Sequence, residues 1–351
     1  MNIKHILLMN IMIGGLHASQ KALTIGDVSC GWAQHIGTRS DQEDRVRNWS
    51  FTVYNNHFDL SIVCDGHGGS QVAEYVVNNL PDALDAELVK YAQHRYKFSD
   101  MCEGVNVVER ALQEAIAYCE NEILKNQNEN EVQPGTTLIA SLLDLTNKKR
   151  YIANVGDSRF YHFKSCGKET FKTKDHVISD KQETTYIEKY GGIIAKGAGY
   201  GQFGVYLKTK QEGGLDGSRS LGDKHLKTFV GLDGKQGPIN SAPDIYVQDI
   251  EEGDIEMLVT DGYTSNMDDI FGEISRDTYQ KDTFDTTMPD QQFFHKYLYG
   301  ESLMVAENEL GGDRVLAKIA QRKIYALRAM SESLTAGMDN VTVLLRRIVS
   351  K

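Results

Sequence analysis

The stretch Val63–Val76, with the sequence VCDGHGGSQVAEYV, is the most informative part of this chain for predicting its fold and its chemistry. The apolar segment Ser61–Cys64 leads to an acid, Asp65, and His67 follows among glycines. Apolar side chains then recur at helical spacing over residues 71–80. The stretch therefore predicts a buried strand that delivers a carboxylate and an imidazole to a glycine turn, from which a helix starts.

Composition narrows the class of protein. The chain has 351 residues, of which 40% are hydrophobic and 25% are charged, as in soluble globular proteins. Its 38 Lys and Arg residues against 49 Asp and Glu residues give a net charge of −11, so we expect no nucleic-acid partner. The five cysteines are scattered without a CxxC spacing, which indicates neither a disulfide framework nor a zinc site.

The N-terminal segment has two interpretations. Lys4 and His5 precede an apolar run at residues 6–16, and small residues follow near Ala18, a pattern typical of a short secretory signal peptide. The alternative is an extension of a cytoplasmic protein. We favour the secretory pathway and assign residues 1–20 to the signal peptide or extension. The run is too short for a transmembrane helix, and no other segment is apolar enough, so we expect no membrane span.

The rest of the chain reads as blocks of strands and blocks of helices. Strand signals lie at residues 28–64, 136–172, 254–260 and 340–349, and helix signals lie at 71–80, 103–127, 180–190 and 315–330. The strands of residues 136–172 read as a meander of antiparallel hairpins, and the glycine-rich residues 191–217 read as a loop or flap. Such blocks indicate an α+β fold, with a central antiparallel β-sandwich flanked by helices on both outer faces. We expect one catalytic domain over residues 24–351.

Acids recur where apolar strands end. Each one alone is more often a structural turn, since Asp-Gly is a common turn sequence. In a sandwich, however, the ends of several strands meet at one edge, where carboxylates repel one another unless cations neutralise them. Oxygen ligands without a His or Cys pair favour Mg²⁺ or Mn²⁺ over zinc. The acids concerned are Glu43, Asp44, Asp65, Asp157, Asp261 and Asp339.

A metal centre of this kind has a defined chemistry. Two ions about 4 Å apart make a hydroxide from water and hold a phosphoryl group for in-line attack. Arg39 lies close before Glu43 and supplies a guanidinium that binds a phosphate through two hydrogen bonds. Gly66 has no side chain, so its carbonyl can approach a metal. His67, close behind Asp65, supplies a proton for the leaving oxygen.

The motifs that carry these residues resemble those of the metal-dependent Ser/Thr protein phosphatases of type 2C. The resemblance runs in order over nearly the whole chain after residue 24, and eight motifs in order are far more specific than any one of them. They are Arg39–Asp44 (RSDQED), Val63–Gly69 (VCDGHGG), Gly135–Thr137 (GTT), Ala153–Arg159 (ANVGDSR), Asp175–His176 (DH), Gly217–Asp223 (GSRSLGD), Thr260–Gly262 (TDG) and Asp339–Thr342 (DNVT).

The resemblance implies a role for each metal ligand. It implies that Asp65 bridges two ions, Mg²⁺ or Mn²⁺, at one edge of the sandwich, and that Gly66 lends its carbonyl. Asp261 and Asp339 would hold one ion, and Glu43 would act on the other.

The resemblance also implies roles around the metals. Asp44 would orient water bound to the ions, Arg39 would bind the substrate phosphate, and His67 would protonate the departing Ser or Thr oxygen. Asp157 fits a third ion, which stays uncertain because Ser265 stands where the family usually has a further Asp.

A second group of motif residues is expected to have supporting or structural roles. For the strand-end residues we favour hydrogen bonding within the fold over catalysis. The supporting residues are Thr137 and Asn340, and the structural ones are Ser158, Arg159, Arg219 and Asp223.

The function implied is dephosphorylation of phosphoserine and phosphothreonine proteins by a metal-activated water, in a protein that we expect to be a monomer. Two alternatives stay open. One is a catalytically weak member that only binds phosphoproteins. The other is a phosphohydrolase acting on small molecules, with specificity residing in residues 196–214.

Overall fold

The computed structural model describes eleven segments: residues 28–94, 96–98, 100–102, 105–128, 131–164, 169–196, 203–207, 210–227, 237–264, 310–312 and 339–348. Three expectations lie outside these segments. They concern the signal peptide or extension at residues 1–20, the helix at residues 315–330, and Ser265. Each stays a prediction, and sequencing of the mature N-terminus would test the first.

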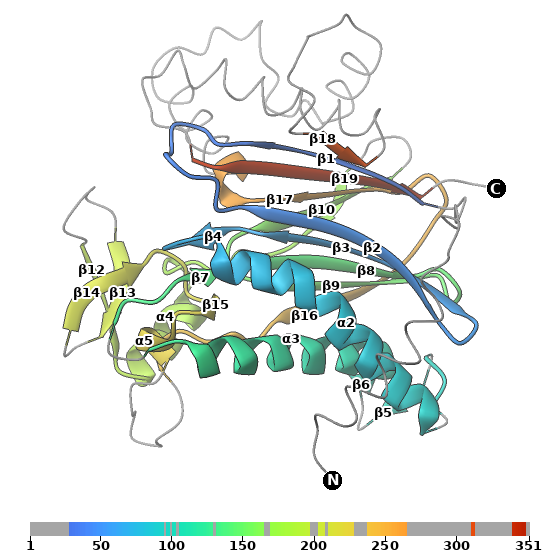
Figure 1. The fold of residues 1–351 in the computed structure, drawn as a ribbon, viewed down its shortest axis with the longest axis horizontal. Helices are drawn as coiled ribbons and strands as arrows, with labels where there is room; N and C mark the ends of the chain where they lie inside the picture. The colour runs from blue at the N-terminus through green and yellow to red at the C-terminus, as the bar shows by residue number, and fades with distance from the viewer. Residues whose placement is uncertain are drawn as a thin grey trace, which may run out of the picture.

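Two antiparallel sheets lie face to face and form the body of the molecule (Figure 1). The first, called the β19 sheet, has the strand order β11-β10-β17-β19-β1-β18. Its strands are β1 (Val28–His35), β10 (Arg159–Phe163), β11 (Glu169–Lys172), β17 (Ile255–Val259), β18 (Leu310–Gly312) and β19 (Val341–Ile348). The second, called the β3 sheet, has the order β16-β9-β8-β3-β2. Its strands are β2 (Arg45–Val53), β3 (Asn56–Cys64), β8 (Leu138–Asp144), β9 (Lys149–Val155) and β16 (Asp244–Asp249).

Strand β3 is apolar because both of its faces are covered. Leu60 and Ile62 point to the helices, whereas Val63, on the opposite face, points to the β19 sheet. The core between the sheets is therefore a separate cluster from the core beneath the helices. Its fully buried members are Val63, Ile139, Ile152, Phe160, Leu258 and Leu344.

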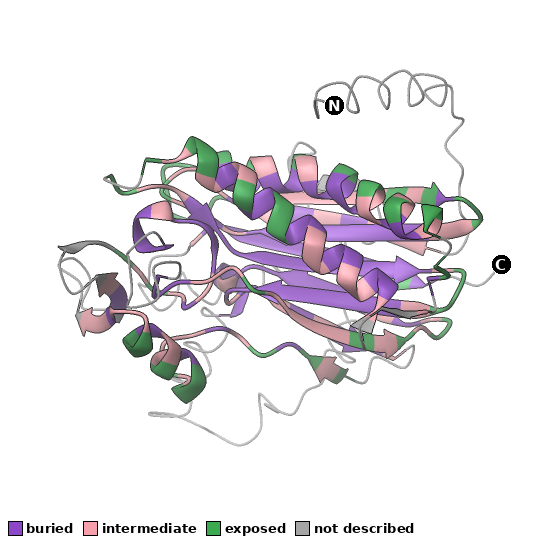
Figure 2. Cartoon of the chain, turned by 90° about the horizontal axis from the view of Figure 1, so that it is seen from below, coloured by how far each residue is buried: buried purple, intermediate pink, exposed green. Residues whose placement is uncertain are grey.

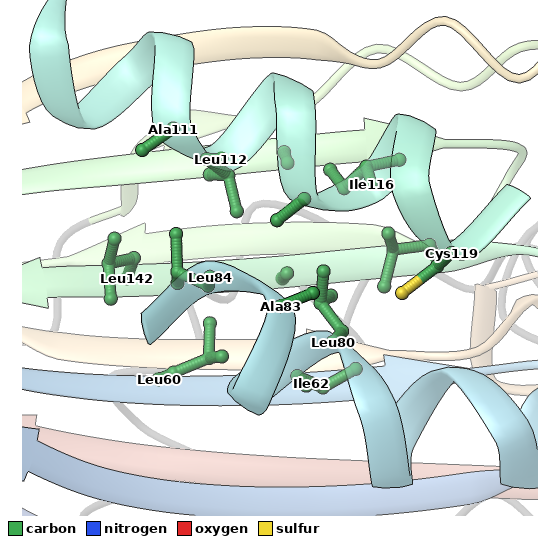
Figure 3. Packing of buried hydrophobic residues seen from close by; sticks show 14 of the residues in the cluster. Leu60, Ile62, Leu80, Ala83, Leu84, Ala111, Leu112, Ile116, Cys119 and Leu142 are labelled. Atoms are coloured by element: carbon green, nitrogen blue, oxygen red, sulfur yellow. The ribbon is translucent and has the colours of Figure 1, made fainter. Parts of the chain in front are cut away.

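Helices α2 (Gln71–Gln93) and α3 (Val107–Asn126) cover the outer face of the β3 sheet, and their buried sides interlock (Figure 3). Helix α2 is longer than the 71–80 segment that its periodicity predicted. It continues through Pro81 because the apolar stripe goes on with Leu84 and Leu88. Figure 2 shows this division, with buried strands beneath helices whose outer sides are exposed. Among the residues described, no helix combines the length and apolarity that crossing a bilayer demands.

The expected α+β sandwich is confirmed, but the predicted meander is wrong at one step. Strands β8 and β9 form a hairpin, and so do β10 and β11. Strands β9 and β10 do not pair, because β10 pairs with β17 in the opposite sheet. The chain crosses between the sheets at Gly156, whose φ of +106° suits a glycine. This crossing leaves Asp157 at the rim of the sandwich.

The glycine-rich region predicted to be a loop contains a small sheet. Its strands are β12 (Gly192–Lys196), β13 (Phe203–Leu207) and β14 (Lys210–Leu215), and α4 (Lys181–Lys189) packs beside it. A small apolar cluster joins Ile187 and Val205 to Leu226 and Ile239. Because the residues of this cluster lie far apart in the sequence, no local periodicity predicts these strands.

The described residues also form two more small sheets and a short helix. Strands β5 (Met101–Cys102) and β6 (Val105–Asn106) pair ahead of α3. Strand β7 (Gly135–Thr136) lies between β4 (Gly66–His67) and β15 (Leu221–Gly222), and α5 (Lys224–Lys227) follows.

The interior of the sandwich is charged at one end. Arg150 and Arg346 are fully buried and share Glu256, to which Arg346 donates from Nε at 2.7 Å. Arg346 also donates to Asp59 at 2.8 Å. Asp59 lies in strand β3 and Asp65 directly follows it, six residues later. Because an extended chain rises about 3.3 Å per residue, this network lies about 20 Å from the Asp65 end of the sandwich.

Glu256→Gln should destabilise the fold strongly. The substitution keeps the shape but removes the charge that two buried guanidinium groups share, at a cost of about 3–5 kcal/mol. Urea denaturation measures this loss. Lys149→Ala is the control, because Lys149 pairs with Asp249 in solvent, and such pairs contribute about 1 kcal/mol or less. Equal losses in the two variants would contradict a network held by buried charge.

Candidate active site

Strand pairing brings the predicted acids to one end of the sandwich. Arg45 pairs with Cys64, so Asp44 and Asp65 leave adjacent strand ends. Val259 pairs with Val343, so Asp261 follows β17 at the end where Asp339 precedes β19. The register of four strands therefore assembles what the sequence scatters over about 300 positions.

The carboxyl groups of Asp65 and Asp261 hydrogen-bond to one another. Burial, together with the charges of Asp44 and Asp261, raises the pKa of Asp65 well above its usual range. Burial and the neighbouring Asp339 raise the pKa of Asp261 as well, although the hydrogen bond to Asp65 lowers it. Two carboxyl groups in such contact share a proton unless a cation takes its place.

Asp44 is held beneath this pair. Its Oδ2 accepts hydrogen bonds from Thr342 at 2.7 Å and from Thr260 at 3.1 Å. Its Oδ1 is buried and has no hydrogen-bond partner among the described residues. Burial, partly offset by the Thr342 hydrogen bond, raises the pKa of Asp44 to about 7. Burial and Asp261 likewise raise the pKa of Asp157 to about 8.

These observations fit a hard cation. Buried carboxyl groups in mutual contact and an unpartnered buried oxygen are the donor set that Mg²⁺ and Mn²⁺ prefer. As the side chains lie, no group of three His, Cys, Asp or Glu residues in the described segments is arranged to hold an ion. Carboxyl groups of the set are instead engaged with one another or with Arg39.

Arg39 lies at the rim of the acid cluster. Its guanidinium contacts Asp339 at 2.5 Å, with 58% of the Arg39 side chain exposed. Asn340 shapes the loop that carries it, because its side chain accepts from the backbone N–H of Glu43 at 2.7 Å and donates to the carbonyl of Ile36 at 2.8 Å. The expected supporting role of Asn340 thus takes the form of loop positioning.

The turn after Asp65 is fixed by strand β7. Thr137 Oγ1 accepts from the backbone N–H of Asp65 at 3.1 Å, and Thr136 Oγ1 donates to its carbonyl at 2.9 Å. A Cβ on Gly66 would lie 2.6 Å from the carbonyl oxygen of Glu43, so only glycine allows these two loops to approach.

His67 has a partner that the sequence did not predict. Its Nε2 lies 2.8 Å from Oδ2 of Asp223, which also accepts from Ser220 Oγ at 2.6 Å. Burial lowers the pKa of His67, but the Asp223 carboxylate outweighs burial and the pKa is raised. Burial acts in the opposite direction on Asp223, where the charge of His67 prevails and the pKa is lowered. The pair therefore favours a protonated imidazole beside an ionised carboxylate.

Asp223 was expected only to stabilise a strand end. The available sequence signal was its place at the end of the motif Gly217–Asp223. In the structure Asp223 adopts a φ of 52°, a conformation uncommon for residues other than glycine. The long separation from His67 along the chain left nothing local to connect them.

The other residues expected to be structural do make structural contacts. Arg159 binds Asp175 through two nitrogens, at 2.9 and 2.5 Å. Arg219 forms ion pairs with Glu183 at 2.6 Å and Asp244 at 2.9 Å. Ser158 is hydrogen-bonded to Thr137.

Comparisons with a family model and with curated proteins point to the same family. Residues 37–269 match the family model described as Protein phosphatase 2C. "Probable protein phosphatase 2C 52" of Oryza sativa subsp. japonica is 30% identical over 235 residues, which cover 67% of this chain and 40% of that protein. "Probable protein phosphatase 2C 5" of Paramecium tetraurelia is 26% identical over 309 residues, which cover 86% of this chain and 89% of that protein.

Solved structures agree in fold. A serine-threonine phosphatase 2C from Toxoplasma gondii superimposes with a TM-score of 0.63 at 17% identity, covering 92% of this chain and 95% of that one. A C. elegans sex determining protein gives a TM-score of 0.58 at 19% identity, covering 97% of this chain and 72% of that one.

Divalent metal should stabilise the folded protein, because an ion would relieve the repulsion among the buried carboxyl groups. At 100 times its dissociation constant, Mn²⁺ or Mg²⁺ should add about 2.7 kcal/mol to the free energy of unfolding. Thermal unfolding with EDTA and with added metal measures the effect. Asp65→Asn should abolish most of this response, whereas the exposed Asp249→Asn should keep it. An unchanged response in Asp65→Asn would count against the site.

Proposed function

The chain belongs to the protein phosphatase 2C family, and we propose that it removes phosphate from phosphoserine and phosphothreonine in proteins, with Mg²⁺ or Mn²⁺ as cofactor. The observation that carries the proposal is the buried carboxyl pair of Asp65 and Asp261, with Arg39 and His67 close by. The chain spans 40% of the rice relative and 89% of the Paramecium relative, so the substrate belongs to the proposal.

The acid cluster would hold two ions. The candidate ligands are Asp65, Asp261, Asp339 and Glu43, with the carbonyl of Gly66, and Asp157 is the candidate for a third ion. The chemistry that bound Mg²⁺ or Mn²⁺ supplies is neutralisation of phosphoryl charge and acidification of water for in-line attack on phosphorus. Asp44, fixed by two threonine hydroxyls and with one oxygen unpartnered, is suited to orienting that water.

Arg39 would bind the phosphate. Its guanidinium sits at the exposed rim of the cluster, where, among the described residues, it pairs with Asp339. A doubly charged phosphoryl group offers two oxygens to the planar guanidinium, a stronger partner than one exposed carboxylate. Substrate binding would therefore draw Arg39 from Asp339 and free a candidate metal ligand.

His67 would supply the proton to the leaving oxygen. The alkoxide of Ser or Thr is a poor leaving group, so protonation as the P–O bond breaks lowers the barrier. The imidazole is about one-third exposed, and Asp223 favours its protonated form. A nitrophenolate needs no such help.

The first test is hydrolysis of a phosphothreonine peptide. We expect turnover with Mn²⁺ or Mg²⁺ and none with EDTA. Asp65→Asn and Asp261→Asn should each lower kcat by about 100-fold or more, because each removes a charge that the metal centre needs. Lys149→Ala, in the distant exposed ion pair, should keep full activity. Metal-independent turnover would refute the mechanism, and turnover of small phosphate esters alone would favour the small-molecule alternative.

The second test separates the proton donor from the metal centre. His67→Ala should lower kcat on the phosphothreonine peptide by roughly 10²–10⁴-fold, the usual contribution of a general acid. Its effect on nitrophenyl phosphate should be small. Steady-state kinetics on both substrates measure the difference, and equal losses on both would show that His67 is not the acid.

A further inference from the structure

A three-stranded sheet brings His67 and Asp223 together. Strand β7 lies in the middle, pairing Gly135 with His67 on one side and with Gly222 on the other. The two side chains therefore meet over the backbone of β7. A Cβ on Gly135 would lie 2.0 Å from Oδ2 of Asp223 and 2.5 Å from Nε2 of His67, so the pair packs directly against the glycine.

Asp223 is held firmly in this place. Its side chain is 3% exposed, and its backbone N–H donates to the carbonyl of Pro134 at 3.1 Å. Helix α3 secures the same turn through Glu120, which accepts from the N–H of Gly222 at 2.8 Å and from Lys227 at 2.5 Å. A carboxylate anchored from so many directions can fix the ring that binds it.

We propose that Asp223 is the positioning residue of His67 and that it directs Nδ1, rather than Nε2, of the imidazole towards the leaving oxygen. This inference rests on the proposed function, because it takes His67 as the proton donor. The carboxylate itself does not touch the substrate.

The contact decides which nitrogen acts. Asp223 can only accept, so His67 donates Nε2–H to it, and the second proton of the imidazolium is on Nδ1. In the reaction a water oxygen bonds to phosphorus, the bond from phosphorus to the Ser or Thr oxygen breaks, and the Nδ1 proton passes to that oxygen. The products are inorganic phosphate and the free hydroxyl, and the neutral imidazole keeps its Nε2–H on Asp223.

Two other His–Asp pairs show what a structural role looks like. His162 Nε2 lies 3.0 Å from Asp254, and His176 Nε2 lies 3.1 Å from Asp244. The Asp254 carboxylate is buried like that of Asp223, and it belongs to the charged end of the sandwich, far from the acid cluster. Asp254→Asn is therefore a control for the loss of a buried carboxylate that lies beside a histidine.

The experiment compares Asp223→Asn with Asp254→Asn in the Mn²⁺-loaded protein, at a temperature where circular dichroism shows both to be folded. Asp223→Asn should lower kcat on the phosphothreonine peptide by about 10- to 100-fold with little change in KM. Nitrophenyl phosphate hydrolysis should be nearly unchanged. Asp254→Asn should lower the melting temperature and leave both activities intact. Equal losses on the two substrates would overturn the inference.

A double-mutant cycle isolates the dependence on His67. In a His67→Ala background, Asp223→Asn should cost almost nothing further, because the group it positions is gone. A full additional loss would show that Asp223 acts by another route, even if His67 remains the acid. If instead the parent protein hydrolyses neither substrate, it is the proposed function that fails.

A milder variant guards against misfolding. Ser220→Ala removes one hydrogen bond to Asp223 and leaves the His67 contact in place. It should lower kcat on the peptide a few-fold and spare nitrophenyl phosphate, and the same few-fold loss on both substrates would contradict the role of Asp223.

Discussion

Mutual repulsion among buried carboxyl groups at one end of the sandwich is the constraint on which the rest of this structure depends. Asp65 and Asp261 touch, and Asp44 lies buried beneath them with one unpartnered oxygen. Such an arrangement costs free energy in any fold. It persists because β3, β17 and β19, which lead to or from these acids, are buried along most of their length and cannot shift register without exposing apolar faces. The stability of the sandwich thus sustains a site that is unfavourable by itself.

The two ends of the sandwich deal with buried charge in opposite ways. At the far end, Arg150 and Arg346 neutralise Glu256 and its neighbours from within the protein, so the network is complete. At the Asp65 end, the guanidinium that contacts the cluster is that of Arg39, which is exposed and bound to a rim carboxylate. In the part of the chain that the structure describes, no Lys or Arg side chain forms an ion pair with Asp44, Asp65 or Asp261 deeper in the cluster. An end whose charge is balanced internally serves stability, whereas an end left negative is suited to recruit cations and a substrate that binds them.

The features that depend on a local sequence pattern could be predicted from the sequence. Acids directly after apolar runs marked the strand ends, and the buried stripe of Val107–Asn126 marked its helix. Three features could not be predicted from the sequence because contacts between segments far apart in the chain determine them. Strand β10 joins the opposite sheet through β17, the flap strands are buried by Leu226 and Ile239, and Asp223 meets His67 across β7. In each case the deciding contact is between segments that no short window of sequence contains.

The two parts of the site are positioned by elements of different kinds and need different precision. The acids are placed by long sandwich strands, whereas His67 and its partner are placed by a short sheet that helix α3 secures. Metal binding tolerates small displacement because several oxygens adjust around an ion. Proton transfer does not, since it needs one nitrogen within hydrogen-bond reach of one oxygen. On the proton side, Gly135 leaves no room for a side chain beneath the His67–Asp223 pair, so the two groups that must be placed accurately lie directly against the backbone of β7.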